Sequence, residues 1–175
     1  MANEEPTRED FIKALDYNPD TGVFTWKPRT ADDGPHYKTF NTVWAGKVAG
    51  FPRSENDYLI IGFRRRSFYA HRIAWLITYG EWPSLVDHAN GIRDDNRISN
   101  LRLASFEQNC WNTPKNRNNT SGYKGVTKTG SGKWQAKVCY RGKTYCFGSY
   151  ETPEQAHKVR EREAKRLHGE FARSS

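Results

Sequence analysis

The spacing of apolar residues divides the first half of the chain into short helices and strands. Thr7 and Asp10 form the pattern of a capping box, which predicts a helix with one apolar face. Short, largely apolar runs predict strands at residues 23–26, 43–48 and 58–63. Residues 28–40 have the composition of a loop. The apolar period of residues 69–77 predicts a buried helix that ends at Gly80.

The second half of the chain contains the same kinds of element. Short strands are predicted at residues 85–88 and around Leu101, and a helix begins after Ser105, which has Gln108 at the capping-box position. Farther along, the pattern predicts three strands and then a helix, at residues 123–128, 133–140, 144–147 and 153–168. This mixture of helices and short strands indicates an α+β fold.

Residues 113–122 have the composition of a linker, because this segment lacks large apolar side chains and is rich in Asn. We therefore predict an N-terminal region at 1–112, with a core motif at 68–112, and a C-terminal domain at 123–175. Residues 1–112 carry 14 Lys and Arg against 15 Asp and Glu, a net of −1, whereas residues 113–175 carry 14 against 5, a net of +9. These values sum to the +8 of the chain, and a basic module of this kind is typical of a polyanion-binding protein.

Cysteine usage and the N-terminal sequence favour a cytoplasmic protein. Cys110, Cys139 and Cys146 form no CxxC pair, which argues against a thiolate zinc site. Their odd number, with a polar N-terminus that lacks an apolar signal core, indicates a reducing compartment. No apolar run has the length of a membrane span, so no membrane association is expected.

Candidate chemistry is concentrated at Asp87 and His88, which follow an apolar pair and precede an Asn-Gly turn. Side chains alternate along a strand, so one of two neighbours can bind a cation while the other reaches a water molecule. An amide on the following helix, such as that of Asn109, can supply a second oxygen to the cation. These are the parts required for metal-assisted hydrolysis of a phosphodiester.

The stretch VDHANGIRDDNRISNLRLASFEQNCWN, at residues 86–112, resembles the HNH nucleases (the ββα-metal or His-Me finger group), and in particular their homing-endonuclease branch. The resemblance implies that His88 is the general base and that Asp87 and Asn109 bind one divalent cation. It also implies that Asn100 holds the loop in place. Oxygen ligands suit Mg²⁺ or Mn²⁺.

Other basic residues near this motif are candidates for DNA contacts. The family often has a histidine at the position of His71, and a catalytic role near the phosphate and a capping or core role fit it equally. Arg72 follows it, and a run of arginines occupies a predicted hairpin tip at Arg64, Arg65 and Arg66. These arginines could clamp backbone phosphates, and a solvated tip accounts for the run about as well.

Residues 123–172 are similar to the AP2 DNA-binding domain, through the elements KGV, GKW, FGSY and LHGEFA. In that family a three-stranded antiparallel sheet packed on one helix reads the major groove. By position, the resemblance implies that the groove-facing residues are Lys124, Thr127, Thr129, Lys133, Gln135, Lys137, Thr144 and Cys146. Plant members have several Arg and a Trp at such positions, so their sequence preference does not transfer.

The remaining charged residues of the C-terminal helix are expected on its solvated face, Arg160 and Glu163 among them. We expect no role for His36, His157 and His168, because none has a carboxylate or histidine partner at ligand spacing.

Together the two resemblances predict an HNH endodeoxyribonuclease like the free-standing or intron-encoded homing endonucleases of phages and bacteria. Its expected partner is double-stranded DNA, in the host cytoplasm if a phage encodes it. The sequence points to no protein partner and fits a monomer or a dimer. One alternative is a DNA-binding regulator with an inactive nuclease domain, and the joint presence of Asp87, His88, Asn100 and Asn109 favours the enzyme over it. An RNA-directed nuclease fits less well, because the RNA major groove is too narrow for the sheet.

Overall fold

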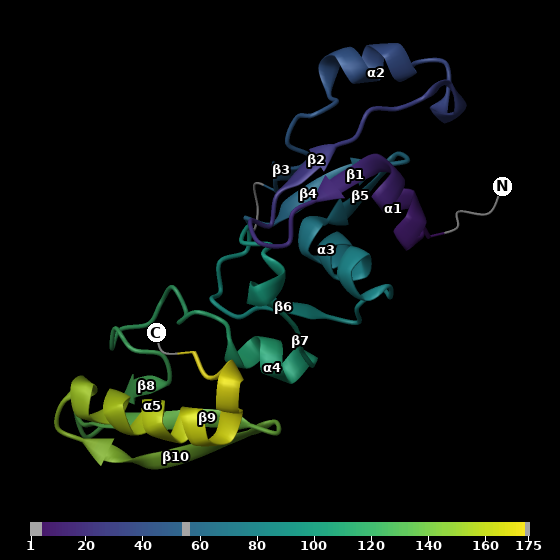
Figure 1. Ribbon diagram of the computed structural model, residues 1–175. Coiled ribbons are helices and arrows are strands. Elements are labelled where there is room, and N and C mark those ends of the chain that lie inside the picture. Colours follow the sequence, from purple (N-terminus) through teal and green to yellow (C-terminus); the bar gives the residue numbers. More distant parts are fainter. Residues whose placement is uncertain (1–4, 54–56, 174–175) are drawn as a thin grey trace. The chain divides into compact units, whose positions relative to one another are not determined.

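The protein is represented by a computed structural model that describes residues 5–53 and 57–173 (Figure 1). It combines helices with small antiparallel sheets, as expected of the α+β class. The chain forms two compact units, Met1–Leu103 and Ala104–Ser175. Within the described ranges, every helix is too short or too polar to span a bilayer.

Short elements that pair with near neighbours in the sequence build the first unit. The β1-β2 and β6-β7 sheets have two strands each, and the order of the third sheet is β3-β4-β5. In chain order the elements are α1 (Arg8–Ala14), β1 (Leu15–Tyr17), β2 (Phe24–Trp26), the 3-10 turn η1 (Ala31–Asp33), α2 (Tyr37–Val43), β3 (Phe51–Pro52), β4 (Leu59–Phe63), β5 (Arg66–Tyr69), α3 (Ala70–Tyr79), β6 (Val86–His88), the 3-10 turn η2 (Ile98–Asn100) and β7 (Leu101–Leu103).

An aromatic and aliphatic core joins α1 and α3 to these sheets. The capping box predicted at Thr7 and Asp10 starts α1, and Phe11 is fully buried with its ring 4.9 Å from that of Phe63. Helix α3 buries most of its side chains and ends at Gly80, which adopts a left-handed conformation. The helices predicted from Thr7 and from residues 69–77 are therefore confirmed.

Two predictions for residues 28–48 are wrong. Residues 28–40 were expected to form a loop, but they contain η1 and most of α2, because the Phe40 ring packs edge-on against Trp26, at 5.6 Å, and beneath the Arg29 guanidinium. Residues 43–48 were expected to form a strand, but a turn through Gly46 interrupts them and only Val48 makes a β-bridge. Apolar residues here do not mark a strand, since Val48 is 66% exposed.

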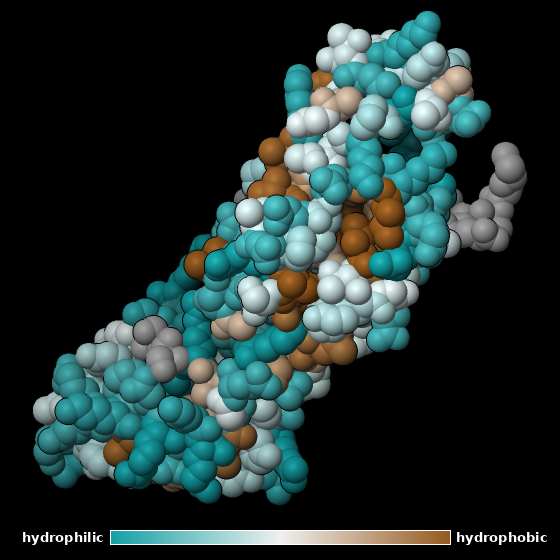
Figure 2. Space-filling model, in the orientation of Figure 1, coloured by the Kyte–Doolittle hydropathy of each residue, from teal (hydrophilic) through white to brown (hydrophobic). Residues whose placement is uncertain are grey.

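The second unit is a three-stranded antiparallel sheet with a helix along one face (Figure 1). Small apolar residues permit the close packing of helix and sheet, and Ala136, Val138, Ala156 and Ala164 are all buried. The elements follow the order that the sequence predicts: α4 (Phe106–Trp111), β8 (Val126–Lys128), β9 (Trp134–Tyr140), β10 (Lys143–Tyr150), α5 (Pro153–His168) and the 3-10 turn η3 (Gly169–Phe171). In Figure 2 the visible face of this unit is mostly hydrophilic.

Helix α4 belongs to the second compact unit, whereas the sequence pattern placed the domain boundary after residue 112. The reason is packing: the Trp111 ring stacks on His168 at 4.2 Å, nearly parallel to it. The Glu107 carboxylate also accepts a hydrogen bond from the backbone of Gly142, at 3.2 Å. His168, expected to have no role, is thus a buried packing residue.

Candidate functional site

Strand β6 carries Asp87 and His88, and both side chains are buried. In the antiparallel β6-β7 pair, Asp87 lies opposite Arg102 and His88 opposite Leu101. Opposite residues share a face, so Arg102 meets the carboxylate directly. Its Nε and Nη2 atoms donate to Asp87 Oδ2, at 3.0 and 2.8 Å. No local pattern in the sequence predicts this role for Arg102.

The His88 imidazole lies on the other side of β6 among polar and aromatic groups. Its Nε2 is 3.4 Å from the side-chain oxygen of Asn96, a contact that fits a tautomer protonated at Nε2. Burial lowers the pKa of His88, while the Asn96 contact and the negative charge of Asp87 act in the opposite direction. The ring is therefore neutral near pH 7 and able to accept a proton.

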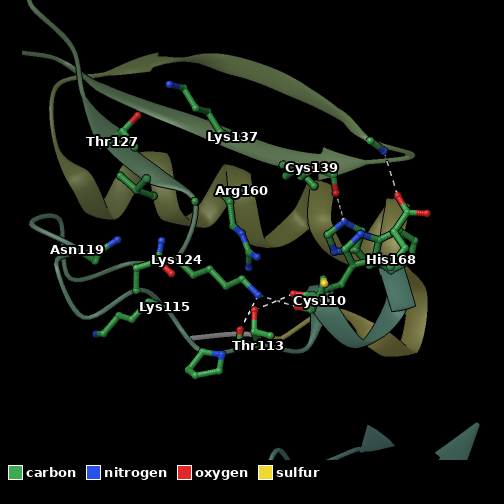
Figure 3. A pocket seen from close by; sticks show the side chains of 18 of the residues that line it. Cys110, Thr113, Lys115, Asn119, Lys124, Thr127, Lys137, Cys139, Arg160 and His168 are labelled. Carbon is green, nitrogen blue, oxygen red and sulfur yellow. Dashed lines mark hydrogen bonds between the residues drawn. The ribbon is translucent and has the colours of Figure 1, made fainter. Parts of the chain in front are cut away.

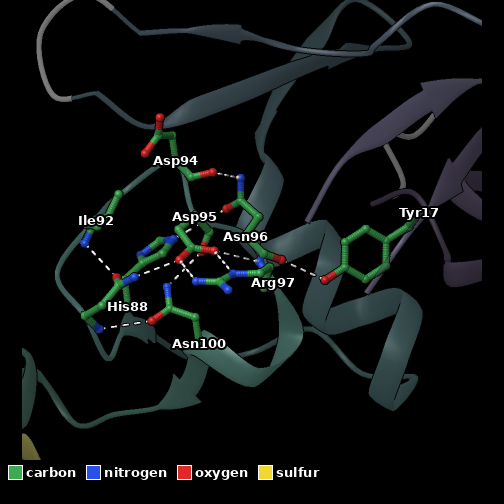
Figure 4. A network of polar contacts seen from close by, with 9 residues as sticks. Tyr17, His88, Ile92, Asp94, Asp95, Asn96, Arg97 and Asn100 are labelled. Carbon is green, nitrogen blue, oxygen red and sulfur yellow. Dashed lines mark hydrogen bonds and ion pairs between the residues drawn. The ribbon is translucent and has the colours of Figure 1, made fainter. Parts of the chain in front are cut away.

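Asn100 closes the loop that follows His88 (Figure 4). Its side-chain oxygen accepts a hydrogen bond from the backbone of Asn90, at 3.0 Å, and its Nδ2 donates to the carbonyl of Asp95, at 2.8 Å. The Asn90 side chain in turn donates to the Asp95 carboxylate, at 2.7 Å. Only 8% of Asn100 is exposed, so its amide serves the loop rather than the solvent.

Strand β1 and the turn at residues 18–22 contact this loop. The Tyr17 hydroxyl donates to the carbonyl of Asn96, at 2.7 Å, and Pro19 accepts a hydrogen bond from the backbone of Ile98, at 3.0 Å. Gly22 has a φ of +74°, and a Cβ atom there would come within 2.5 Å of the Arg97 backbone. The turn chemistry of residues 18–22 is visible in the sequence, but its partner in the loop is not.

His71 lies beside His88, with their ring centroids 5.0 Å apart. It is 7% exposed, and its Nδ1 atom is buried without a hydrogen-bond partner among the described residues. Burial, with smaller contributions from His88 and Arg72, lowers the pKa of His71 to about 3. The structure thus buries His71 in the core, with its ring beside that of the candidate base.

Asn109, the second expected ligand of the cation, lies on α4 in the second unit and is half-buried. Helix α4 begins at the predicted capping box of Ser105 and Gln108. Within residues 5–53 and 57–173, no three His, Cys, Asp or Glu side chains gather as a metal site. Asp87 and Asn109 each carry side-chain oxygen atoms, the donor type that suits a hard cation.

The candidate DNA-binding arginines of the first unit differ in how they are held. Arg64 and Arg65 form the predicted hairpin tip with positive φ angles of 48° and 61°, and Arg66 begins β5. Both Arg64 and Arg65 are exposed, and Arg64 donates to the Asp10 carboxylate, at 3.0 Å. Arg72 is half-buried, with its guanidinium 5.7 Å from the centre of the Trp82 ring.

Five candidate DNA-binding residues share the sheet face that points away from α5. The register pairs Thr127 with Gln135, and it pairs Lys137 with Cys146. Thr144 lies opposite Cys139 on the same face. The set that shares this face is Thr127, Gln135, Lys137, Thr144 and Cys146.

Three candidates are held differently. Lys133 forms an ion pair with Glu151, at 2.6 Å, and the Thr129 hydroxyl donates to the Lys133 carbonyl, at 3.0 Å. Lys124 precedes β8 and is half-buried. Its ammonium donates inward to backbone carbonyls, so it does not project from the sheet face.

Comparison with known proteins relates the chain to nucleases. Residues 68–110 match the family described as HNH endonuclease. An uncharacterized HNH endonuclease of Acanthamoeba polyphaga mimivirus is 37% identical over 105 residues, which are 58% of this chain and 54% of that protein. Protein 3.8 of Escherichia phage T7 is 33% identical over 106 residues, which are 59% of this chain and 87% of that protein. The match thus spans about half of the mimivirus protein and most of the phage protein. No solved structure matches the chain.

Proposed function

Because the chain belongs to the HNH endonuclease family, we propose that it is a metal-dependent endonuclease that hydrolyses phosphodiester bonds of double-stranded DNA. The observation that carries this proposal is the pair on β6: a buried carboxylate and a neutral, buried imidazole on adjacent residues. Such a pair can serve a cation and a water molecule from opposite sides of one strand.

His88 acts as the general base in this proposal. Its neutral ring takes a proton from a water molecule, and the water oxygen forms a bond to phosphorus as the bond to the 3′ oxygen breaks. The pKa of His88 lies below the usual histidine value, so the base form predominates near pH 7. The loop that Asn100 closes keeps the ring aimed.

Asp87 and Asn109 would hold the divalent cation, Mg²⁺ or Mn²⁺, through oxygen atoms. Asn109 is a candidate ligand because residues 86–112 resemble the HNH motif, in which this position follows Asp87 in the family's order and spacing. When bound, such a cation neutralises charge on the phosphate and on the leaving oxygen. Arg102 positions the Asp87 carboxylate, since it holds one of the two oxygens by paired hydrogen bonds.

The second unit is proposed to grip the duplex in the manner of an AP2 domain. The exposed sheet face carries Lys137 and several neutral polar side chains, and few acids oppose them in this part of the chain. Arg64, Arg65, Arg66 and Arg72 would add contacts to backbone phosphates from the first unit. Linking two modules raises the local concentration of each, so modest affinities suffice.

A catalytically inactive DNA-binding protein is the second candidate. Arg102 favours this candidate, because its guanidinium already neutralises Asp87 and can take the place of a metal ion. The presence of a buried neutral His88 beside that carboxylate favours the enzyme. The two candidates bind DNA equally well and differ in cleavage alone.

The decisive experiment measures cleavage of supercoiled plasmid DNA with Mg²⁺ or Mn²⁺. We expect nicking or linearisation that EDTA abolishes, loss of cleavage in His88→Ala, and DNA binding by that variant close to the parent. Tyr79→Ala, at an exposed position on α3, is the matched control and should cut normally. Cleavage by His88→Ala at the parental rate would remove the base from the proposal, and no cleavage by the parent protein would favour the inactive candidate.

A further inference from the structure

The second unit contains a basic pocket that the proposed reaction does not use. It is a hollow of about 650 Å³ between α4, the segment that follows α4, strands β8 and β9, and helix α5. Its lining includes the basic residues Lys115, Lys124, Lys137 and Arg160, of which Lys137 carries its side chain on the sheet face turned away from α5. One lining residue, Glu107, is an acid. The pocket therefore has an excess of positive charge.

Arg160 is the most unusual of these residues, because its charged side chain is almost completely buried and forms no ion pair with any residue that the structure describes. It is 3% exposed, although the helical pattern predicted a solvated position. Its Nη1 atom donates to the carbonyl of Arg173, at 2.8 Å, and its Nε atom is buried with no partner among the described residues. No described carboxylate lies within ion-pair distance of it. Burial of an uncompensated cation is unfavourable, so this guanidinium lacks an anion.

Lys124 faces the same space from the other side. Figure 3 shows Lys124 and Arg160 extending into the pocket with their charged ends toward each other. The Lys124 ammonium donates to the carbonyls of Trp111 and Thr113, at 2.7 and 2.6 Å. An ammonium group has three donors, and these two contacts hold it in place while leaving one. Burial, followed by the nearby charges of Arg160 and Arg173, lowers the pKa of Lys124 to about 8.

The backbone of Gly125 lies close to the Lys137 carbonyl and to the Arg160 side chain. Gly125 has a φ of +70°, and a Cβ atom there would lie 2.5 Å from the carbonyl of Lys137 and 3.1 Å from Arg160 Nε. Only glycine fits such an approach without strain. The absence of a side chain at Gly125 therefore leaves room for the Arg160 guanidinium beside β8.

We propose that this pocket binds a phosphate group between Lys124 and Arg160. Guanidinium and ammonium donors from opposite walls suit the oxygens of a phosphate, which accepts several charge-assisted hydrogen bonds at once. The phosphate belongs either to the backbone of a bound nucleic acid or to a free phosphate compound. The proposal goes beyond the cleavage reaction and does not depend on it.

The test uses full-length His88→Ala protein, so that cleavage does not interfere, and compares Lys124→Gln with Lys143→Gln. The second substitution removes the same charge from an exposed residue of β10 that does not line the pocket. In the first arm, inorganic phosphate is titrated against chloride at equal ionic strength and the melting temperature is recorded. In the second arm, the affinity for a short DNA duplex is measured over a range of salt concentrations.

A free phosphate source predicts that phosphate raises the melting temperature, with an apparent Kd at least tenfold weaker in Lys124→Gln than in Lys143→Gln. If the phosphate belongs to a nucleic-acid backbone, the two variants should respond alike to inorganic phosphate. In the DNA arm, the slope of log affinity against log salt concentration should then fall by about one unit in Lys124→Gln and by less in Lys143→Gln. Lys124→Arg keeps the charge and should restore binding in either arm. Equal behaviour of Lys124→Gln and Lys143→Gln in both arms would overturn the proposal.

Arg160→Gln serves as the second variant. It is needed because Lys124→Gln also removes the hydrogen bonds to the Trp111 and Thr113 carbonyls, and their loss could itself weaken binding. A urea unfolding curve of each variant establishes that it is folded. If Arg160→Gln is folded and binds phosphate and DNA like the parent protein, the buried guanidinium has only a structural role and the phosphate site is refuted. If it does not fold, the Lys124 series alone decides between the same two outcomes.

Discussion

Arg102 lies directly across the β6-β7 pair from Asp87 and donates two hydrogen bonds to a single oxygen of its carboxylate. Both side chains are largely withdrawn from water, with 16% and 6% exposure. The carboxylate that the sequence assigns to a metal ion is thus already matched with a cation from the neighbouring strand. This pairing makes the arginine a direct probe of the metal hypothesis.

Replacement of Arg102 by glutamine should lower the free energy of unfolding by about 3 to 5 kcal/mol, because it leaves a buried carboxylate without its cationic partner. If Asp87 binds the divalent cation, saturating Mg²⁺ should recover part of that loss. Urea unfolding with and without Mg²⁺ measures both effects. The double variant with Asp87→Asn is the control, and an equal response of the double variant to Mg²⁺ would show that the ion binds elsewhere.

Asn100→Ala should reduce the cleavage rate more than it weakens DNA binding. The substitution removes both hydrogen bonds that close the loop and leaves the Asn90 amide and the Asp95 carbonyl without them. A cost of about 1 to 3 kcal/mol in stability is expected for such buried groups. Ser99→Ala, at the exposed neighbouring position, is the matched control. A normal rate in Asn100→Ala would mean that the loop does not aim His88.

The two faces of the C-terminal sheet should differ in their effect on DNA affinity. Lys137 projects from the face turned away from α5, whereas Lys128 lies opposite Trp134 on the helix side. Lys137→Gln should weaken duplex binding and reduce the salt slope by about one unit, because it removes a phosphate contact. Lys128→Gln should change either quantity less. Fluorescence anisotropy over a salt series measures both, and a reversed order would argue against binding through this face.

His71 should make the protein less stable in acid. Its pKa is lowered to about 3 in the folded state, whereas an unfolded histidine titrates near 6.5. Between these values the unfolded chain binds the additional proton, so stability is fully present above about pH 6.5 and is lost as the pH falls toward 3. His71→Phe keeps an aromatic ring beside Tyr58 and Tyr69 and removes this titration.

Urea unfolding between pH 7 and pH 5 tests the prediction. The parent protein should lose up to about 1.4 kcal/mol more per pH unit than His71→Phe. Parallel pH profiles for the two proteins would show that the pKa of His71 is the same in the folded and unfolded states, and would contradict the prediction. Cleavage by a folded His71→Phe variant would, in addition, assign His71 a packing role rather than a catalytic one.

Local chemistry determined much of this protein directly from the sequence. Capping boxes at Thr7 and Ser105, the apolar period of α3 and the alternation along β9 depend on near neighbours, so the elements that they predict are present. The order of Asp87, His88, Asn100 and Asn109 is likewise a property of the sequence, and the first two lie on β6, where neighbouring side chains alternate between faces.

Tertiary structure alone decided what surrounds those residues. The partners of Asp87, His88 and Arg160 come from another strand, a loop or a distant segment, and nothing local to them specifies such contacts. For the same reason the prediction of a solvated position for Arg160 is wrong, because other segments of the chain bury its side chain. Side-chain pattern sets which face of an element is apolar, but burial and charge pairing depend on which other elements come to lie against that face.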